Sequence, residues 1–294
     1  ILITGATGTL GSAYARICKT RNLACHVLTR QEMDITDPAS VEAAIGRYKP
    51  WAIINAGGYV RVDEAEGDPE RCMRENTLGP TILALACIRH QLRFMTFSTD
   101  LVFDGTKGTP YVESDALNPL GVYGRSKMEA EQRVLDADPQ ALVIRTSAFF
   151  GPWDQHNFVT LALNALESGQ PFQAAGDMVV SPTYVPDLVN VSLDLLIDRE
   201  RGVWHLSNAE ALTWAELAKR ACDTAGVDHA KLEVVSSETC GHVARRPEYS
   251  ALSSERALML PSLDDALHRY VEAMQDRAHG RDAEVPGEAA HYAS

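Results

Sequence analysis

Short apolar runs and amphipathic stretches alternate through the first half of the chain. The apolar runs stay apolar through their length, as strands that are buried on both faces require. The predicted strands cover residues 1–6, 23–30, 51–58, 93–103 and 141–151. Predicted helices cover residues 10–21, 37–49 and 68–90, and a further helix carries Tyr123 and Lys127. Strands and helices in alternation predict a parallel sheet covered on both faces.

The pattern becomes less regular after residue 151. Helical periodicity returns in residues 157–169, 186–198, 213–226 and 262–277, with extended segments at 172–185 and 202–208. We therefore predict an α/β fold: a doubly wound, Rossmann-like parallel sheet in residues 1–150, and a smaller C-terminal α/β substrate lobe. The lobe spans residues 151–277, with segments that return to the first domain. Residues 278–294 are polar and aperiodic, which predicts a poorly ordered tail.

A glycine-rich turn, "TGATGTLG" at residues 4–11, joins the first predicted strand to the first predicted helix. Glycines at positions 5, 8 and 11 permit a tight turn and close approach of the backbone to a ligand. The following helix N-terminus offers unpaired N–H groups to an anion. A purely structural turn is the alternative, but the strand–turn–helix context favours a dinucleotide pyrophosphate site. Residues 1–150 are therefore predicted to bind NAD(P).

Tyr123 and Lys127 lie four positions apart in "YGRSKMEAE", so a helix places both on one face. This spacing also arises by chance on ordinary helix surfaces, and the pair gains meaning only from its context. The motifs before it supply that context: the GxxGxxG turn, then "NAGG" at residues 55–58, then "STD" at residues 98–100.

The net charge of −13 argues against general nucleic-acid binding and against binding to anionic membranes. The six cysteines show no metal-ligand spacing, the histidines show no HxH or HExxH pattern, and no apolar run has the length of a membrane span. We therefore predict no metal, no nucleic acid, no membrane and a cytoplasmic location. The sequence begins inside a strand-like run without Met, so an upstream fused domain is one alternative that the sequence leaves open. A homodimer is another.

Several motifs in family order resemble the dTDP-4-dehydrorhamnose reductase family of the extended short-chain dehydrogenase/reductase superfamily. They include "MDITDPASV", "STDLVFDG", "NPLGVYGRSK", "IRTSAFFG" and "RRPEYSALSSERAL", and the resemblance spans roughly residues 1 to 275. The resemblance implies reduction of the 4-keto group of a nucleotide-linked deoxysugar by NAD(P)H. It implies that Tyr123 donates the proton, that Lys127 holds the nicotinamide ribose and that Thr99 bonds the carbonyl oxygen or the Tyr123 hydroxyl. A free tyrosine has a pKa of about 10. A close ammonium stabilises the phenolate, so we expect Lys127 to lower the pKa of Tyr123.

The resemblance also implies cofactor contacts along the carboxyl edge of the first domain. Arg30 follows the second strand, where it can meet a 2′-phosphate, so we expect NADPH, with NADH as the alternative. The alternative for Arg30 is a solvated surface charge with no role in binding. Asn76 either supports a proton-relay water or only caps backbone groups. The full implied set is Gly5, Thr7, Gly8, Thr9, Leu10, Gly11, Arg30, Asp34, Ile35, Asn55, Ala56, Gly57 and Asn76, with Tyr123 and Lys127.

The predicted substrate pocket departs from the family pattern. Family members usually carry a Trp after "RTS", where this chain has Ala148, and a Lys where it has Glu64. Trp153 is either a replacement contact or plain packing. The predicted substrate-binding residues are Tyr59, Asp100, Ala148, Asn157 and Thr183.

Two other functions stay open on the sequence alone. The regulatory subunit of methionine adenosyltransferase resembles the same reductases, so a non-catalytic NADP-binding protein is one of them. A related nucleotide-sugar epimerase or dehydratase is the other. Such epimerases and dehydratases commonly carry a different residue beside the catalytic Thr or Ser, where this chain has Asp100.

Overall fold

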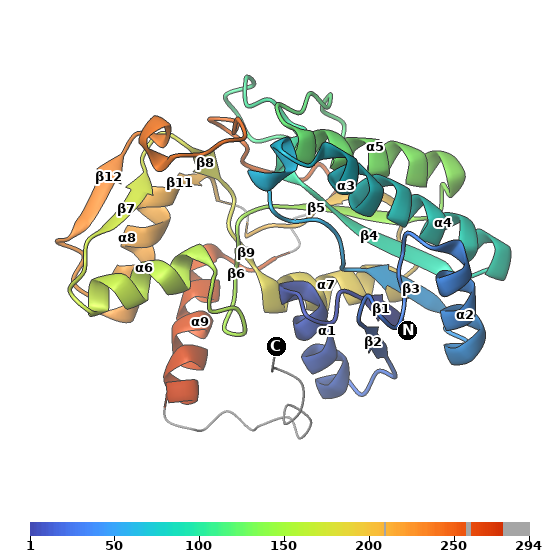
Figure 1. Cartoon of the computed structure of the whole chain (residues 1–294). Coiled ribbons are helices and arrows are strands. Elements are labelled where there is room, and N and C mark those ends of the chain that lie inside the picture. The colour runs from blue at the N-terminus through green and yellow to red at the C-terminus, as the bar shows by residue number, and fades with distance from the viewer. Residues whose placement is uncertain (209, 257–259, 279–294) are drawn as a thin grey trace.

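The centre of the molecule is a six-stranded sheet in the order β10-β5-β4-β3-β1-β2, and every neighbouring pair is parallel. The computed structural model describes residues 1–208, 210–256 and 260–278. The sheet confirms the predicted doubly wound fold (Figure 1). Its strands are β1 (Leu2–Thr4), β2 (His26–Leu28), β3 (Ala52–Asn55), β4 (Arg93–Thr99), β5 (Leu142–Thr146) and β10 (Gly202–His205).

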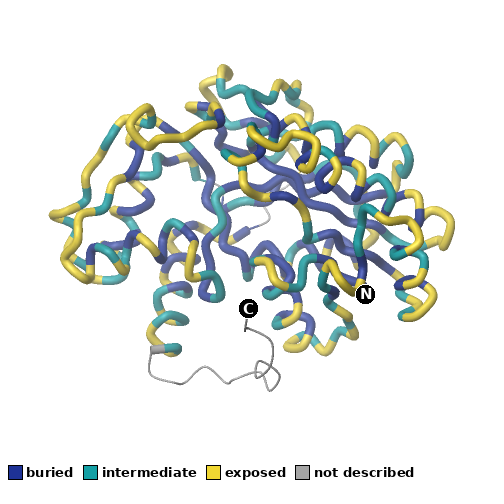
Figure 2. Tube along the Cα trace, in the orientation of Figure 1, coloured by how far each residue is buried: buried dark blue, intermediate teal, exposed yellow. Residues whose placement is uncertain are grey.

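Helices cover both faces of this sheet (Figure 1). Side chains of successive strand residues point to opposite faces, so Ile54 joins one apolar core and Ile53 the other. The first core is closed by α1 (Thr9–Thr20) and α7 (Val185–Ile197). The second is closed by α2 (Pro38–Tyr48), α4 (Gly79–His90) and α5 (Val122–Ala137). Figure 2 shows the sheet as the most deeply buried part of the trace.

The single helix predicted over residues 68–90 is divided in the structure. α3 (Pro69–Met73) is followed by one π-helical segment, η2 (Arg74–Leu78), before α4 begins. Pro80 has no N–H to donate to the carbonyl one turn earlier, which accounts for the break in the regular ladder. Glu75 and Asn76 are buried within this wider turn.

A smaller lobe lies beside the sheet, at the left of Figure 1. Its core joins side chains of α6, α8 and α9 with Phe150 and Tyr184. The division at residue 150 stays a prediction, and α7 and β10 from the later half pack into the first domain. The lobe elements are α6 (Phe158–Glu167), α8 (Trp214–Ala225), α9 (Leu263–Ala278), and the strand pairs β7 (Phe172–Ala175) with β12 (Leu232–Val235), β8 (Val179–Val180) with β11 (Leu212–Thr213), and β6 (Phe149–Phe150) with β9 (Thr183–Tyr184).

Strand β12 is absent from the sequence-based prediction. None of its four residues is buried, and Glu233 and Val234 are exposed, so it lacks the alternation that marks a half-buried strand. The three short turns η1 (Glu64–Glu66), η3 (Asp100–Val102) and η4 (Ser237–Cys240) complete the elements of the described ranges. The predicted tail lies outside the described residues, apart from Ala278 at the end of α9. In the described ranges, no helix has the length and apolar character of a membrane span.

Candidate active site

Two cavities open at the carboxyl edge of the sheet. After β1 the chain crosses to β2 at one edge of the sheet, and after β3 it crosses to β4 in the opposite direction. The loops after β1 and β3 therefore diverge. Such a switch point is where open α/β sheets bind ligands. A cavity of about 160 Å³ lies there, and a second, of about 650 Å³, lies between the ends of β4 and β5 and the smaller lobe. Of the predicted cofactor residues, the smaller cavity is lined by Gly5, Thr7, Arg30, Asp34, Ile35 and Gly57.

The glycine turn approaches the β3 loop and its own helix more closely than a side chain permits. Gly5 has a φ of +79°, and a Cβ there would lie 2.8 Å from the carbonyl oxygen of Ala56. A Cβ on Gly11 would lie 2.0 Å from the carbonyl oxygen of Gly5. Gly8 precedes α1 as its N-cap with no side-chain cap bond, so the N–H groups of the first helical turn stay available to an anion.

Substituting Gly11 with Ala is expected to weaken NADPH binding by at least about tenfold, because the turn must move to admit the methyl group. We also expect lower stability, by about 1–3 kcal/mol, from overpacking. Equilibrium binding of NADPH and urea unfolding measure the two effects. Gly46→Ala is the control, because a Cβ at that helical glycine meets nothing within 4 Å. Wild-type NADPH affinity in the Gly11 variant would contradict the assignment.

The side chains of Asn55 and Asn76 make hydrogen bonds to other groups of the protein. Thr4 donates to Asn55 over 2.8 Å, and the Asn55 amide donates to Thr96 over 3.2 Å. The Asn76 oxygen accepts from the Tyr59 N–H over 2.8 Å, and its amide donates to the Tyr59 carbonyl over 2.9 Å and to the Ser126 hydroxyl over 3.0 Å. These contacts match the backbone-capping interpretation of Asn76. Seven predicted cofactor residues do not line the smaller cavity in the described structure: Gly8, Thr9, Leu10, Gly11, Asn55, Ala56 and Asn76.

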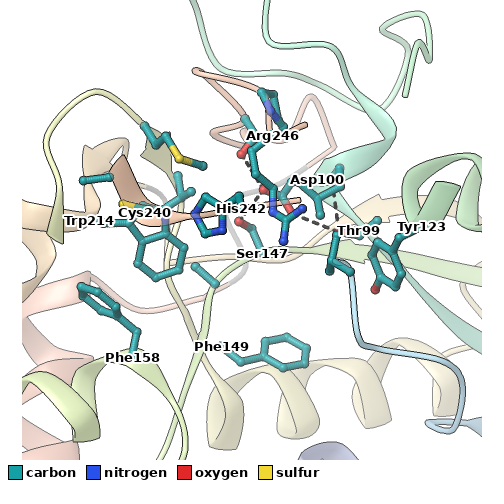
Figure 3. A pocket seen from close by; sticks show the side chains of 18 of the residues that line it. Thr99, Asp100, Tyr123, Ser147, Phe149, Phe158, Trp214, Cys240, His242 and Arg246 are labelled. Carbon is teal, nitrogen blue, oxygen red and sulfur yellow. Dashed lines mark hydrogen bonds between the residues drawn. The ribbon is translucent and has the colours of Figure 1, made fainter. Parts of the chain in front are cut away.

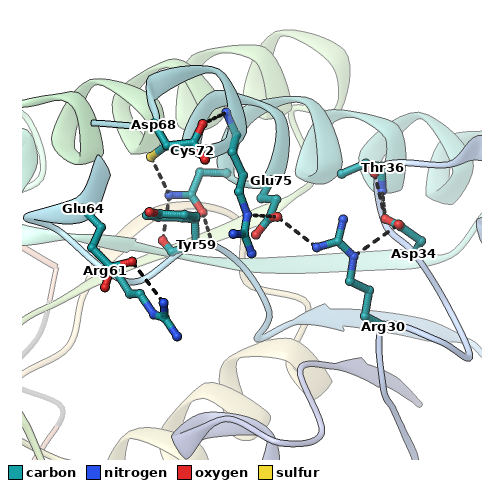
Figure 4. Close-up of polar contacts among 11 residues, drawn as sticks. Arg30, Asp34, Thr36, Tyr59, Arg61, Glu64, Asp68, Cys72 and Glu75 are labelled. Carbon is teal, nitrogen blue, oxygen red and sulfur yellow. Dashed lines mark hydrogen bonds and ion pairs between the residues drawn. The ribbon is translucent and has the colours of Figure 1, made fainter. Parts of the chain in front are cut away.

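Arg30 stands at the mouth of the smaller cavity, already paired with two carboxylates (Figure 4). Its guanidinium lies 2.9 Å from Glu75 and 3.3 Å from Asp34, with the Glu75 bond the main cause of its raised pKa. Glu75 also accepts from Arg71 over 2.9 Å. The Arg30 side chain is 54% exposed, so it can turn to a further anion while Arg71 still neutralises Glu75.

Tyr123 and Lys127 share the face of α5 that meets the sheet. The Lys127 ammonium donates to the Phe97 carbonyl over 3.2 Å and lies 5.9 Å from the centre of the Tyr123 ring. Burial lowers the pKa of Lys127 to about 8. Thr99 ends β4 beside Thr146 of β5, and with Tyr123 it lines the larger cavity. The sheet and helix therefore bring the three predicted catalytic residues to one place.

The expected lowering of the Tyr123 pKa is wrong in direction. Burial raises the pKa of Tyr123, the nearby charge of Asp100 raises it further, and only the Thr99 hydroxyl opposes them. The ammonium of Lys127 is directed to the Phe97 carbonyl instead of the phenol. Tyr123 is thus held in its protonated form across the neutral range.

Asp100 collects three hydroxyl donors from three segments of the chain. Its carboxylate accepts from Thr99 over 3.0 Å, from Ser147 over 2.8 Å and from Ser250 over 2.5 Å. Burial raises the pKa of Asp100, and the three hydroxyls oppose that shift. Ser147 directly follows β5, the position where a parallel sheet places ligand-binding residues, which is a signal that sequence reasoning missed. Ser250 carries no such signal, because it reaches the site from a distant loop.

The far end of the larger cavity is aromatic (Figure 3). The Phe158 ring meets Trp214 edge-on at 4.7 Å and Phe172 at 5.4 Å, both between ring centroids. His242 and Arg246 stand between this end and Thr99. Sequence reasoning missed all five, because amphipathic periodicity assigns Phe158 and Trp214 to helix packing.

The predicted substrate residues are divided by the structure. Asp100 and Ala148 line the larger cavity, and Ala148 has a left-handed backbone with a φ of 40°. In the described structure Tyr59, Asn157 and Thr183 do not line it. Tyr59 is buried below Arg71, Asn157 caps α6, and Thr183 accepts from Thr146 over 3.1 Å.

Neither Trp153 nor Glu64 lines the larger cavity in the described structure. Trp153 packs against the core beside α1, with the Arg16 guanidinium 5.6 Å from its ring centre. Glu64 pairs with Arg61 at the surface. No group of three or more His, Cys, Asp or Glu in the described residues is placed to hold a metal ion, and the lack of a metal stays a prediction.

Comparison with known proteins identifies the family. Residues 1–276 match the family model described as the RmlD substrate binding domain. The dTDP-4-dehydrorhamnose reductase of Mycolicibacterium smegmatis is 33% identical over 280 residues, covering 94% of this chain and 84% of the relative. The chain belongs to the dTDP-4-dehydrorhamnose reductase family. The resemblance stated from the motifs is confirmed, and membership makes the chain an oxidoreductase of the nucleotide-sugar-reductase type.

Further proteins resemble this chain in length or in structure. The spore coat polysaccharide biosynthesis protein SpsK of Bacillus subtilis is 33% identical, with 92% of this chain and 96% of the relative covered. The crystal structure of the reductase from Bacillus anthracis in complex with NADP has a TM-score of 0.87 and 28% identity, covering 92% of this chain and 97% of that one. The Thermus thermophilus UDP-glucose 4-epimerase, at 19% identity and a TM-score of 0.74, shares the fold.

Proposed function

We propose that this protein reduces the 4-keto group of a nucleotide-linked deoxysugar with NADPH, and that Tyr123 donates the proton. One observation carries the proposal: Thr99 and Tyr123 line the larger cavity, and the Lys127 ammonium lies 5.9 Å from the centre of the Tyr123 ring, in a chain of this reductase family. The turn fits a dinucleotide, because Gly5 and Gly11 leave no space for a Cβ where the backbone approaches most closely. The relative from Bacillus anthracis in complex with NADP supports NADPH.

The chain's own residues supply the proton and the position. NADPH, when bound, supplies the hydride that reduces the carbonyl carbon. Tyr123 gives its phenolic proton to the carbonyl oxygen, so ketone, hydride and proton balance to an alcohol. Thr99 holds the oxygen or the phenol in place. Lys127 holds the nicotinamide ribose in this proposal, and a pKa of about 8 leaves most of it protonated at neutral pH.

The direct test follows NADPH absorbance during incubation with dTDP-, UDP- and GDP-linked 4-keto-6-deoxy sugars. We expect stoichiometric NADPH oxidation with one of them, which also separates a reductase from an epimerase because an epimerase consumes no net NADPH. No oxidation with any of the three, together with a stable complex with a partner enzyme, would support the regulatory alternative and sink the proposal.

Asp100→Asn is expected to move the pH profile of reduction to lower pH. The Asp100 carboxylate disfavours the Tyr123 phenolate and so raises the pKa of Tyr123. Without that charge the phenol ionises at lower pH, and the alkaline fall in kcat begins earlier. The measurement is kcat against pH for both proteins. An alkaline limb that stays in place in the variant contradicts the charge coupling.

A further inference from the structure

Arg246 is the one Lys or Arg among the described residues that line the larger cavity. Its side chain is 14% exposed. It extends from the loop after η4, and Figure 3 shows it between the aromatic end, at Trp214 and Phe158, and the catalytic end, at Thr99 and Tyr123. A cation in the middle of a mostly apolar cavity, in a chain of net charge −13, is expected to bind an anion there.

One carboxylate, Asp63, holds Arg246 and its loop in place. Asp63 accepts from the Arg246 guanidinium over 3.0 Å through one oxygen. Its other oxygen accepts from the backbone N–H groups of Val243 and Ala244, both over 2.9 Å. Asp63 directly follows Val62, which lines the same cavity, so these contacts join the two loops at its mouth.

The Arg246 guanidinium keeps donors for a ligand. Five N–H donors are present in arginine. One nitrogen, Nη2, is directed to Asp63 and the other, Nη1, to the Ala244 carbonyl over 3.0 Å. The remaining N–H groups match two oxygens of a phosphate, the geometry in which arginine binds best.

We propose that Arg246 binds the diphosphate of the nucleotide-linked substrate and that Asp63 is its positioning residue. This inference rests on the proposed function. The order of groups along the cavity matches such a substrate: the ketone at Tyr123, the diphosphate at Arg246, and the base against the edge-on rings of Phe158 and Trp214. On this proposal, the specificity for a nucleoside diphosphate comes from a loop more than 100 residues beyond the end of the catalytic helix.

The test measures dTDP, UDP and GDP binding by calorimetry in wild-type protein and in Arg246→Gln. We expect the best-bound diphosphate to bind about 10- to 100-fold more weakly to Arg246→Gln, from the loss of a charge-assisted bidentate contact. NADPH affinity is expected to stay unchanged. Arg246→Lys keeps the charge without the planar fork and is expected to bind with intermediate affinity. Arg245→Gln is the matched control, because Arg245 is the exposed neighbour on the same loop and its substitution removes the same charge.

Equal diphosphate affinity in wild type and Arg246→Gln overturns this inference. If wild-type protein oxidises NADPH with a nucleotide sugar and Arg246→Gln keeps the same KM, the proposed function stands and only the role of Arg246 falls. If wild-type protein neither binds a nucleoside diphosphate nor oxidises NADPH with its sugar, the proposed function itself falls.

Asp63 is tested separately through the KM of the nucleotide sugar. Asp63→Ala is expected to raise that KM about three- to tenfold while kcat and the KM for NADPH stay within about twofold, because only the Arg246 loop loses its anchor. Hydrogen exchange of the Val243 and Ala244 amides is expected to become faster. Glu64→Ala is the control, since its carboxylate pairs with Arg61 at the surface. Equal changes in kcat and in both KM values would show a general structural defect and overturn the positioning role.

Discussion

Replacing Tyr123 with Phe is expected to lower kcat for ketone reduction by about 100- to 10 000-fold, the usual contribution of a positioned general acid. Phe keeps the ring that packs against the buried Ala65, Cys72 and Val122, so the fold is retained. Only the O–H that supplies the proton is lost. The measurements are kcat by NADPH oxidation and the dissociation constant of NADPH by fluorescence titration. We expect the dissociation constant to change by less than about twofold, since Lys127 and the glycine turn are untouched.

Tyr14→Phe is the matched control for this variant. Tyr14 is a buried tyrosine whose hydroxyl lies 2.6 Å from the Ser192 hydroxyl, and it lies between α1 and α7, away from the larger cavity. Removing that hydroxyl is expected to cost about 1 kcal/mol of stability and no activity. If Tyr123→Phe turned over substrate at the wild-type rate, the proton donor would have to be another group. If it lost NADPH binding together with turnover, Tyr123 would be a binding residue.

Local features of the site could be predicted from the sequence, because each lies within one element. The Tyr123–Lys127 pair needs only the helical repeat, and the Gly5–Gly11 turn needs only the strand before it and the helix after it. The strands of the sheet were predictable for the same reason, since burial on both faces leaves them apolar. Strand β12, with no buried residue, gave no comparable pattern.

The long-range features could not be predicted, because the fold decides which distant residues meet. Ser250 reaches Asp100 across 150 positions, and Arg246 reaches Asp63 across 183. The direction of the Tyr123 pKa shift belongs to the same class. Its sequence neighbour Lys127 predicts a lowering, but burial and the Asp100 charge, which only the packed site reveals, produce the opposite.

A buried ion pair fixes the catalytic helix to the sheet, and breaking it is expected to have a large effect on stability. Glu131 on α5 and Arg145 on β5 each have side chains 4% exposed and share contacts of 2.6, 3.0 and 3.1 Å. Glu131→Leu leaves the Arg145 charge buried without its carboxylate. We expect a loss of about 3–5 kcal/mol in the free energy of unfolding, measured by urea denaturation.

The double variant Glu131→Leu/Arg145→Met separates charge from packing. Because both charges are removed and apolar volume replaces them, most of the lost stability is expected to return. Glu129→Leu is the control on the same helix: its pair with Arg133 is exposed, so its removal is expected to cost less than about 0.5 kcal/mol. A double variant as unstable as Glu131→Leu would show that the pair itself stabilises the fold.

The same pair is expected to affect catalysis through position. Tyr123, Lys127 and Glu131 recur at intervals of four, so they lie along one face of α5. Arg145 on β5 stands two residues before Ser147, whose hydroxyl donates to Asp100. We therefore expect the Glu131–Arg145 contact to fix the distance between Tyr123 and the Asp100 carboxylate. If so, the double variant recovers stability while its kcat stays below wild type, and a kcat that returns fully with stability would assign the pair to folding alone.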